Sequence, residues 1–200
     1  MQTRLLFATN NEHKIREIRA AIPPSIEVIG LKQAGIDIDI PEPYETLEEN
    51  ARAKSRTIFD LTGISCFSED TGLEVNALGG APGVRSARYA GPGRSSEENI
   101  DKLLVELEQQ ENRRANFRTV ISLIWDRKEF LFEGICEGAI LYARKGSGGF
   151  GYDSVFVPDG AERTFGEMNL EEKNEFSHRK KAAAKLVLFL QNLGKPAAKN

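Results

Sequence analysis

The sequence predicts an α/β fold with a mixed β-sheet, and two patterns support this prediction. Over residues 1–65, short apolar runs alternate with helical segments, as strands connected by helices do. Over residues 117–125, apolar residues recur at every second position, which is typical of a long strand, and a polar turn leads into a partner run. No repeat or linker divides the chain, so we expect one domain over residues 1–194 and a flexible tail at 195–200.

Turn and cap residues set the elements of the first half. Pro23 and Pro24 end the first helix, because proline lacks the backbone donor that a helix needs. Thr46 with Glu49 is typical of a capping box, and Gly63 is a helix stop. The predicted order is a strand at 5–8, a helix from about 12 to 22, a strand at 26–29, a proline-containing loop at 31–45, a helix from 47 to about 61 and a strand at 64–68.

The second half is predicted to hold the long hairpin and a last helix. Leu186, Val187 and Leu190 form the apolar stripe of that helix. The predicted order is a rigid turn cluster at 79–83, a helix at 95–109, strands at 117–125 and 129–141, a glycine-rich loop at 148–153, a short strand at 155–157 and a helix from about 177.

Composition is that of a globular protein and excludes several function classes. Hydrophobic residues make up 40% of the chain and the net charge is −3, so there is no basic surface for a nucleic-acid polymer. No apolar run approaches the ~18 residues of a membrane span, and no signal peptide follows Arg4. Cys66 and Cys136 fit buried thiols of a reducing compartment, with a disulfide left open. We expect a cytoplasmic protein without membrane partners.

The loop Gly-Gly-Phe-Gly-Tyr-Asp at residues 148–153 is hard to explain as scaffold alone. Its glycines let the backbone approach a ligand closely, Phe150 offers a flat face and Asp153 offers an acceptor. This combination suits a planar, polar ligand such as a nucleobase. The alternative is a hairpin turn whose aromatic rings, including Tyr152, point into the core.

The strand-to-helix junction at residues 9–14 is a candidate anion site. A helix N-terminus presents unpaired amides and a partial positive charge, and Thr9, Asn11 and Lys14 add side-chain donors. The glycines of a P-loop are missing, so wrapping of a triphosphate by such a loop is not implied. Ordinary helix capping by Asn10 or Asn11, with Lys14 in solvent, is the alternative.

Glu69-Asp70-Thr71-Gly72 follows an apolar strand, and we expect it at the end of that strand. Ligands bind at strand ends in α/β sheets, so Asp70 could hold Mg²⁺ or position a water. Adjacent carboxylates repel each other unless a cation, solvent or hydrogen bonds compensate. An Asx turn closed by Gly72 explains the same residues without chemistry.

Glu42 and Lys54 are weaker candidates. Glu42 lies in the proline-stiffened loop and Lys54 on the capped helix that follows. They join the site only if that helix turns this face toward Asp70. The alternative is a surface acid and a solvated lysine.

Lys173 and the run Ser177-His178-Arg179 gather donors near the start of the last helix. Ser177 can cap that helix. His178 and Arg179 then project from a helix N-terminus, where positive charge is unfavourable for stability but suits an electron-rich ligand. Zinc is not expected, because the only other histidine, His13, lies elsewhere and no Cys–His spacing supports it.

Together these segments resemble the inosine/xanthosine triphosphate pyrophosphatase family, also called Ham1-like, over residues 4–192. The matching motifs are Thr9-x-Asn11-x-x-Lys14, Glu-Asp-Thr-Gly at 69–72, Gly-Gly-x-Pro-Gly before Ser86-Ala87-Arg88, Gly-Phe-Gly-Tyr-Asp at 149–153 and Ser177-His178-Arg179. Many bacterial members have Asp-Asp-Ser where this chain has Glu69-Asp70-Thr71, a departure that keeps the carboxylate and the hydroxyl.

The resemblance implies an elongated mixed sheet flanked by helices, an active-site cleft between two lobes, and a homodimer. It also implies Mg²⁺-dependent hydrolysis of the purine nucleoside triphosphates ITP, dITP and XTP to the monophosphate and pyrophosphate. Asp70 would be the catalytic carboxylate, and Glu42 and Asp70 would hold the metal. The implied substrate-binding residues are Thr9, Asn10, Asn11, Glu12, His13, Lys14, Lys54, Thr71, Phe150, Gly151, Tyr152, Asp153, Lys173, His178 and Arg179.

Base selection is predicted from hydrogen-bond chemistry. Donors from Lys173 or Arg179 suit the 6-oxo group of hypoxanthine or xanthine, whereas adenine presents an amino donor there. Guanine shares the 6-oxo group, so its exclusion must occur at the 2-amino position, and the sequence does not show by which residue. Two alternatives stay open: a Maf-type nucleotide pyrophosphatase with another base preference, and a nucleotide-binding module that does not hydrolyse.

Overall fold

The computed structural model describes residues 3–193. The predicted tail at 195–200 and the end of the predicted domain at residue 194 lie outside the described residues. The strands are β1 (Thr3–Phe7), β2 (Ile26–Gly30), β3 (Cys66–Val75), β4 (Pro82–Gly83), β5 (Arg114–Trp125), β6 (Lys128–Ile140) and β7 (Phe156–Pro158). The helices are α1 (Glu12–Ala21), α2 (Leu47–Thr62), α3 (Ser96–Glu106), α4 (Leu170–Phe176) and α5 (His178–Leu193), with 3₁₀ turns η1 (Asn76–Leu78) and η2 (Ser86–Arg88).

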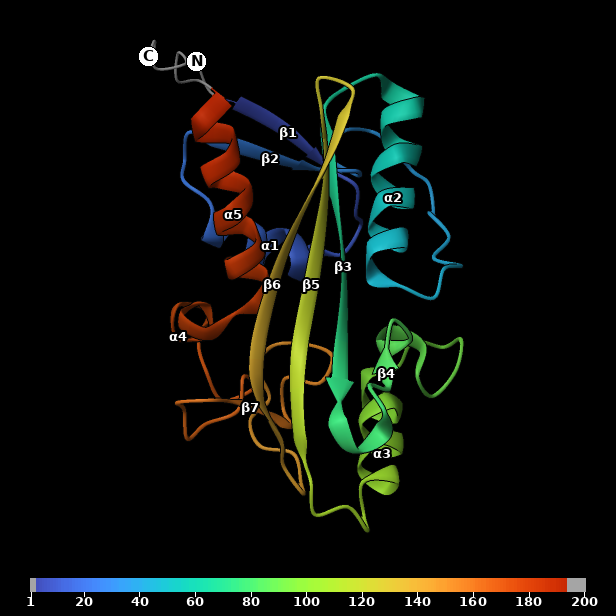
Figure 1. Ribbon diagram of the computed structural model, residues 1–200, viewed down its shortest axis with the longest axis vertical. Helices are drawn as coiled ribbons and strands as arrows, with labels where there is room; N and C mark the ends of the chain where they lie inside the picture. The colour runs from blue at the N-terminus through green and yellow to red at the C-terminus, as the bar shows by residue number, and fades with distance from the viewer. Residues whose placement is uncertain (1–2, 194–200) are drawn as a thin grey trace, which may run out of the picture.

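One mixed sheet organises the molecule, as the sequence predicts. Its strand order is β2-β1-β3-β5-β6-β7, and β4 pairs with β3 outside this path. β1 is parallel to β2 and β3, whereas β3, β5, β6 and β7 are antiparallel neighbours. The long strands β3, β5 and β6 run along the length of an elongated molecule (Figure 1).

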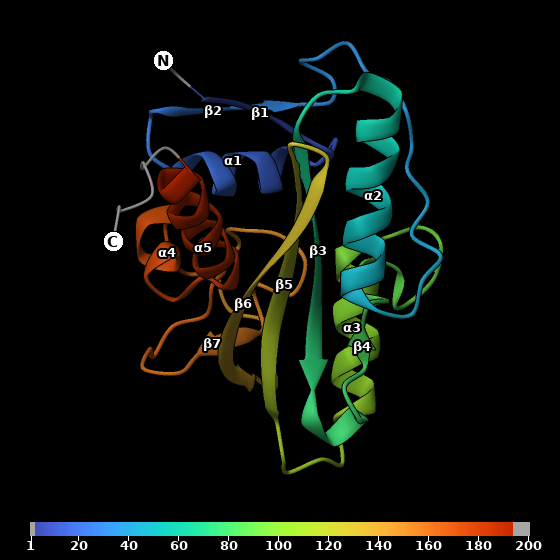
Figure 2. The same cartoon turned by 45° about the horizontal axis from the view of Figure 1, so that its top comes forward.

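Helices cover both faces of the long strands. α2 lies on one face, and α5 and α1 lie on the other (Figures 1 and 2). Side chains alternate between these faces along β3 because the strand repeat is two residues. Ser68 donates to the carbonyl of Ala51 in α2, whereas Phe67 packs in the core cluster that contains Ala182 of α5.

Two of the four apolar core clusters in the described residues mark two lobes of the molecule. One core contains Leu5, Phe67 and Leu186, from strands β1 and β3 and helix α5. The other contains Leu103 and Phe156, at the far end of the long strands where α3 and β7 pack. The cavities described below are lined by residues from both lobes, which is the cleft that the resemblance implies.

β1 and β3 separate after two paired positions, and this separation opens the cleft. Leu6 pairs with Cys66 and Phe7 with Phe67, and no register pair follows. The chain after β1 turns into α1, while β3 continues for eight residues beyond Phe67. The segment from Glu69 onward thus has β5 on one side and no β1 partner on the other.

The prediction that the strand ends at residue 68 was wrong, because β3 continues to Val75. Glu69 to Gly72 pair with β5 in the middle of β3, so the Asx turn closed by Gly72 is also wrong. Polar side chains interrupt the apolar pattern at these positions, so the sequence pattern does not indicate that the strand continues. Glycine is needed at position 72 because a Cβ would lie 2.6 Å from the carbonyl oxygen of Gly83 in β4.

Other differences are local. Thr46 caps α2 by accepting from the amide of Glu49, and Gly63 ends the helix with a φ of 68°. Helix α4 was not predicted, although Asn169 and Glu172 form a complete capping box at its start. The last helix begins at His178, one residue after Ser177. None of the helices of residues 3–193 is long and apolar enough to span a membrane.

Candidate active site

Two adjoining cavities lie in the cleft, each with about 600 Å³ of empty space that is partly open to solvent. The first, here called the aromatic cavity, is lined by Lys14, Thr71, Leu73, Ser86, Ala87, Arg94, Ser96, Asn99, Phe117, Phe150, Gly151, Tyr152, Asp153, Lys173, His178 and Arg179. The second, here called the charged cavity, is lined by Ala8, Thr9, Asn10, Asn11, Lys14, Leu31, Ile38, Asp39, Ile40, Glu42, Lys54 and Arg94.

Glu69 and Asp70 point to opposite faces of β3. The Glu69 carboxylate accepts from Arg179 of α5, whereas Asp70 accepts from Lys54 of α2 at 3.0 Å. Strand alternation therefore separates the two acids, and the repulsion expected between neighbours is replaced by a cationic partner for each. Neither carboxylate lines a cavity itself, but the partner of Glu69, Arg179, lines the aromatic cavity and the partner of Asp70, Lys54, lines the charged cavity.

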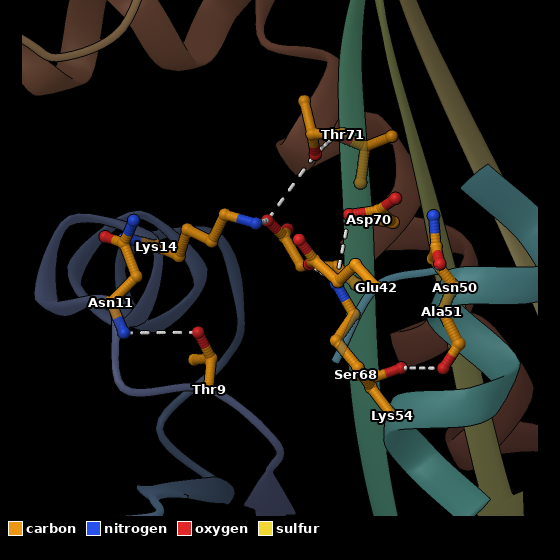
Figure 3. Close-up of polar contacts among 12 residues, drawn as sticks. Thr9, Asn11, Lys14, Glu42, Asn50, Ala51, Lys54, Ser68, Asp70 and Thr71 are labelled. Atoms are coloured by element: carbon orange, nitrogen blue, oxygen red, sulfur yellow. Dashed lines mark hydrogen bonds and ion pairs between the residues drawn. The ribbon is translucent and has the colours of Figure 1, made fainter. Parts of the chain in front are cut away.

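Lys54 joins two carboxylates beside the charged cavity. Its ammonium lies 2.5 Å from Oε1 of Glu42 and 3.0 Å from Oδ1 of Asp70. Figure 3 shows Lys54 reaching both acids from α2, while Lys14 extends toward β3 from α1. The face of α2 that carries Lys54 thus turns toward Asp70. This was the condition under which Glu42 and Lys54 were expected to join the site. Arg88 of η2 donates to the backbone carbonyl of Glu42 and so fixes its loop.

The pKa of Asp70 is raised, whereas the pKa of Glu42 is lowered. Burial raises the pKa of Asp70, and the negative charge of Glu42 adds to the rise against the opposing charges of Lys54 and Lys14. Burial also acts to raise the pKa of Glu42, but the charge and hydrogen bond of Lys54, together with the charges of Lys14 and Arg94, outweigh it and the pKa is lowered. Two carboxylates sharing one ammonium form a coupled group that a second cation or a phosphate can rearrange.

The junction after β1 combines capping with open donors. Asn11 caps α1 by accepting from the amide of Lys14, and its own amide donates to Thr9 Oγ1. Capping accounts for the side-chain oxygen of Asn11, Oδ1, and leaves its side-chain nitrogen, Nδ2, available to a ligand. Lys14 does not project into solvent: its ammonium lies 3.1 Å from Glu69 Oε1. Asn10 donates to the carbonyl of Ile38 and thereby holds the opposite wall.

A buried chain of ion pairs supports the aromatic cavity. Glu17 of α1 accepts from Lys173 at 2.8 Å and from Arg179. Lys173 also donates to Asp153 at 2.6 Å, and Arg179 holds Glu69 with two bonds of 2.7 and 2.9 Å. Burial acts most strongly, to raise the pKa of Glu69 and Glu17, but the charges and hydrogen bonds of Arg179 together with Lys14 (for Glu69) or Lys173 (for Glu17) outweigh it and lower both pKa values. The network holds Glu69 and Glu17 in their charged forms, whereas burial raises the pKa of Asp153 against the charge of Lys173.

His178 is neutral, not cationic as its place at a helix start suggested. Burial lowers its pKa well below the ordinary value, and the charges of Arg179 and Lys173 add to the effect. Its ring stacks on Phe117 at 4.8 Å between centroids. Nδ1 is buried and has no hydrogen-bond partner among the described residues, so it offers a polar atom at the wall of the aromatic cavity.

The glycine-rich loop is both a turn and a cavity wall. Asp153 accepts from the amide of Phe150, and Gly149 has a φ of 74° with no room for a Cβ beside that carboxylate. Tyr152 is buried and donates to the carbonyl of Ser86, as the core alternative predicted. Phe150 stays half-exposed and lines the cavity with Gly151.

Three predicted residues line neither cavity: Glu12, His13 and Asp70, of which Asp70 accepts a hydrogen bond from Lys54, a residue of the charged cavity. Glu12 lines a separate surface depression, and His13 stacks on the outer side of Phe150 at 5.1 Å between ring centroids. Neither side chain lines the aromatic or the charged cavity.

Two functional candidates were missed. Glu17 looks like an ordinary helix acid, and its partners lie 156 and 162 residues away in the chain. Arg94 lines both cavities from a Gly-Pro-Gly loop that carries no recognisable motif. For Glu17, its position three residues after Lys14, one helical turn on, is the signal that could have been used.

Comparisons with known proteins agree with this geometry. The Ham1 family model matches residues 5–189. A dITP/XTP pyrophosphatase of Flavobacterium psychrophilum is 47% identical over 188 residues, covering 94% of this chain and 99% of the relative. One of Porphyromonas gingivalis is 49% identical over 188 residues, covering 94% and 97%.

Solved structures give the same assignment. The Ham1 protein of Staphylococcus aureus superposes with a TM-score of 0.86 at 38% identity, covering 96% of this chain and 100% of that one. The sequence and the fold are thus those of one family, and this chain belongs to the Ham1 family.

Proposed function

We propose that this protein hydrolyses non-standard purine nucleoside triphosphates, namely ITP, dITP and XTP, to the monophosphate and pyrophosphate. The observation that supports it most is the junction of an aromatic and a charged cavity across β3, with Asp70 on one face and Glu69 on the other. A base fits the first cavity and a triphosphate the second. Relatives named dITP/XTP pyrophosphatase over nearly their whole length support the substrate class.

The donor set fits Mg²⁺ as the cofactor. Mg²⁺ prefers oxygen ligands and is commonly bound by one or two carboxylates together with substrate phosphates. Glu42 and Asp70 supply two carboxylates on one ammonium, and no group of three His, Cys, Asp or Glu side chains in residues 3–193 offers a complete protein cage. When bound, Mg²⁺ would neutralise phosphate charge and polarise the phosphoryl group.

The chain's own residues would position the reactants. Asp70, held at 3.0 Å by Lys54, accepts a proton from a water aimed at the α-phosphorus. Lys54 and Lys14 stabilise the charge that develops on the phosphate oxygens, and amides of the α1 start add donors. Thr9 and Asn11 shape the charged cavity on that side.

Base selection depends on donors that the ion network leaves unused. Lys173 has three donors, of which Glu17 and Asp153 occupy two, so one remains for a 6-oxo group. Arg179 spends its donors on Glu69, Glu17 and Thr71, so it acts as a support more than as a direct reader. Phe150 offers a stacking face, a contact worth roughly 1–3 kcal/mol in comparable sites.

One assay tests the proposal. Pyrophosphate release from ITP, XTP, dITP, GTP and ATP is measured with and without Mg²⁺, and the nucleotide product is identified. Preferred release from the first three, dependent on Mg²⁺, supports it. Binding of ITP without turnover indicates the sensing module, and preference for another base class indicates the Maf-type alternative. The homodimer and the cytoplasmic location remain predictions, the first of which light scattering in solution tests.

A further inference from the structure

Arg94 lies where the two cavities meet. It follows Gly91-Pro92-Gly93 in the loop between η2 and α3. Among the described residues, only Lys14 and Arg94 line both the aromatic and the charged cavity. Lys14 reaches the junction from α1 and Arg94 from the opposite lobe, so the two cations flank it.

The charge of Arg94 is not matched by a close acid. Every other lysine or arginine that lines the cavities has a carboxylate within 3.1 Å. In residues 3–193, the guanidinium of Arg94 makes no hydrogen bond or ion pair, and it acts on Glu42 only through its charge. An exposed arginine with five unused donors at the meeting point of two cavities suits an anion.

The backbone of Arg94 is held in an unfavourable conformation. Its φ is 54°, in the left-handed region that side chains other than glycine rarely adopt. Glycine would relieve this strain, yet arginine stands here directly after Gly93. Such strain in a loop is a feature that clusters at functional sites.

We propose that Arg94 binds the α-phosphate of the nucleotide, which must lie between the base and the outer phosphates. The inference rests on the proposed function, because the junction holds an α-phosphate only if the base fills the aromatic cavity. A guanidinium presents two parallel donors to phosphate oxygens, and its charge does not depend on pH. Arg94 is thus a binding and positioning residue supplied by the α3 lobe opposite Lys14.

The test compares Arg94→Ala, Arg94→Lys and the control Arg85→Ala, an exposed arginine that lines neither cavity. Affinity for IMP and for inosine is measured by calorimetry at several salt concentrations, and kcat/KM is measured for ITP. Losing a charge-assisted phosphate contact is expected to weaken IMP binding and lower kcat/KM about 10- to 100-fold in Arg94→Ala. Inosine binding is unchanged, IMP binding becomes less sensitive to salt, and Arg94→Lys recovers part of the loss.

Two results would overturn the assignment. One is IMP affinity in Arg94→Ala within about two-fold of the wild type. The other is a loss with an unchanged salt dependence, which indicates a structural role. If the wild type binds IMP but does not hydrolyse ITP, the proposed function fails while the IMP comparison still decides Arg94. Arg94→Gly adds a check: it relieves the φ strain, so thermal stability rises while IMP binding falls as in Arg94→Ala.

Discussion

Glu69 and Asp70 are neighbours in the chain, but the two faces of β3 give them opposite surroundings. On the α5 face, Glu69 belongs to a buried network in which each acid meets a cation and the pKa of Glu69 and Glu17 is lowered. On the α2 face, Asp70 and Glu42 share the single ammonium of Lys54, and the pKa of Asp70 is raised.

The difference matches two tasks. Reading a base requires donors that do not move or change charge, and a buried network of ion pairs holds them in place at a cost in desolvation. Phosphate chemistry requires charges that can rearrange when a metal or an oxyanion binds. The ammonium of Lys54, shared by Glu42 and Asp70, is such an arrangement. One strand separates the tasks because alternate side chains face opposite sides.

The largest expected effect is on the Asp70 side. Asp70→Asn removes the carboxylate that would accept the proton of water, so kcat for ITP falls by about 10²- to 10⁴-fold. Binding of ITP, measured by calorimetry, is retained because the aromatic cavity is unchanged. Asp159→Asn, an exposed acid paired with Arg114 outside both cavities, is the matched control. Wild-type turnover in Asp70→Asn would refute the role.

On the Glu69 side the largest effect is on stability. Arg179→Ala leaves Glu69 and Glu17 buried without their partner, which costs about 3–5 kcal/mol in the free energy of unfolding. Arg114→Ala breaks an exposed pair with Asp159 and costs less than about 1 kcal/mol. Urea denaturation measures both. If Arg179→Ala folds, its ratio of kcat/KM for ITP over GTP also falls, and equal losses of stability in the two variants contradict the comparison.

The neutral His178 predicts a pH dependence. In the unfolded chain the imidazole takes up a proton below its ordinary pKa of 6.5, whereas in the folded protein the pKa is far lower. The unfolded state then binds more protons, so stability falls as pH drops below 6.5, by about 1.4 kcal/mol per pH unit. The slope is measured by urea denaturation for the wild type, His178→Gln and the exposed control His13→Gln. Of the two variants, only His178→Gln should lose this decrease of stability below pH 6.5.

The smallest expected effect concerns the helix that carries Lys54. Thr46→Ala removes the N-cap of α2 and costs about 1 kcal/mol in stability. The preference for ITP over GTP should not change, because α2 does not line the aromatic cavity. Thermal denaturation and the kcat/KM ratio measure the two parts. A changed preference would mean that the two faces of β3 are coupled.

The parts of the fold with a regular apolar pattern could be predicted from sequence. The β5–β6 hairpin, α2 with its caps, and the mixed sheet follow from periodicity and turn chemistry. The length of β3 could not, because its polar residues face buried partners from two different helices. Helix α4 has only seven residues, too few for a periodic pattern.

For the site, the sequence predicted residues but not their pairing. Lys14, Lys54 and Asp70 were expected near phosphate, and the structure brings them to one place. The sequence could not show that Arg179 donates to Glu17 and Glu69, because those contacts join α5 to α1 and β3. Pairing over such distances is a property of the folded chain.

In the proposed reaction, water attacks the α-phosphorus at the junction between the two cavities. Hydrolysis of ITP in water labelled with heavy oxygen tests it directly, with the label located by mass spectrometry. We expect the label in IMP and none in pyrophosphate. Label in pyrophosphate, or release of single phosphates, would contradict the placement of the reaction beside Asp70.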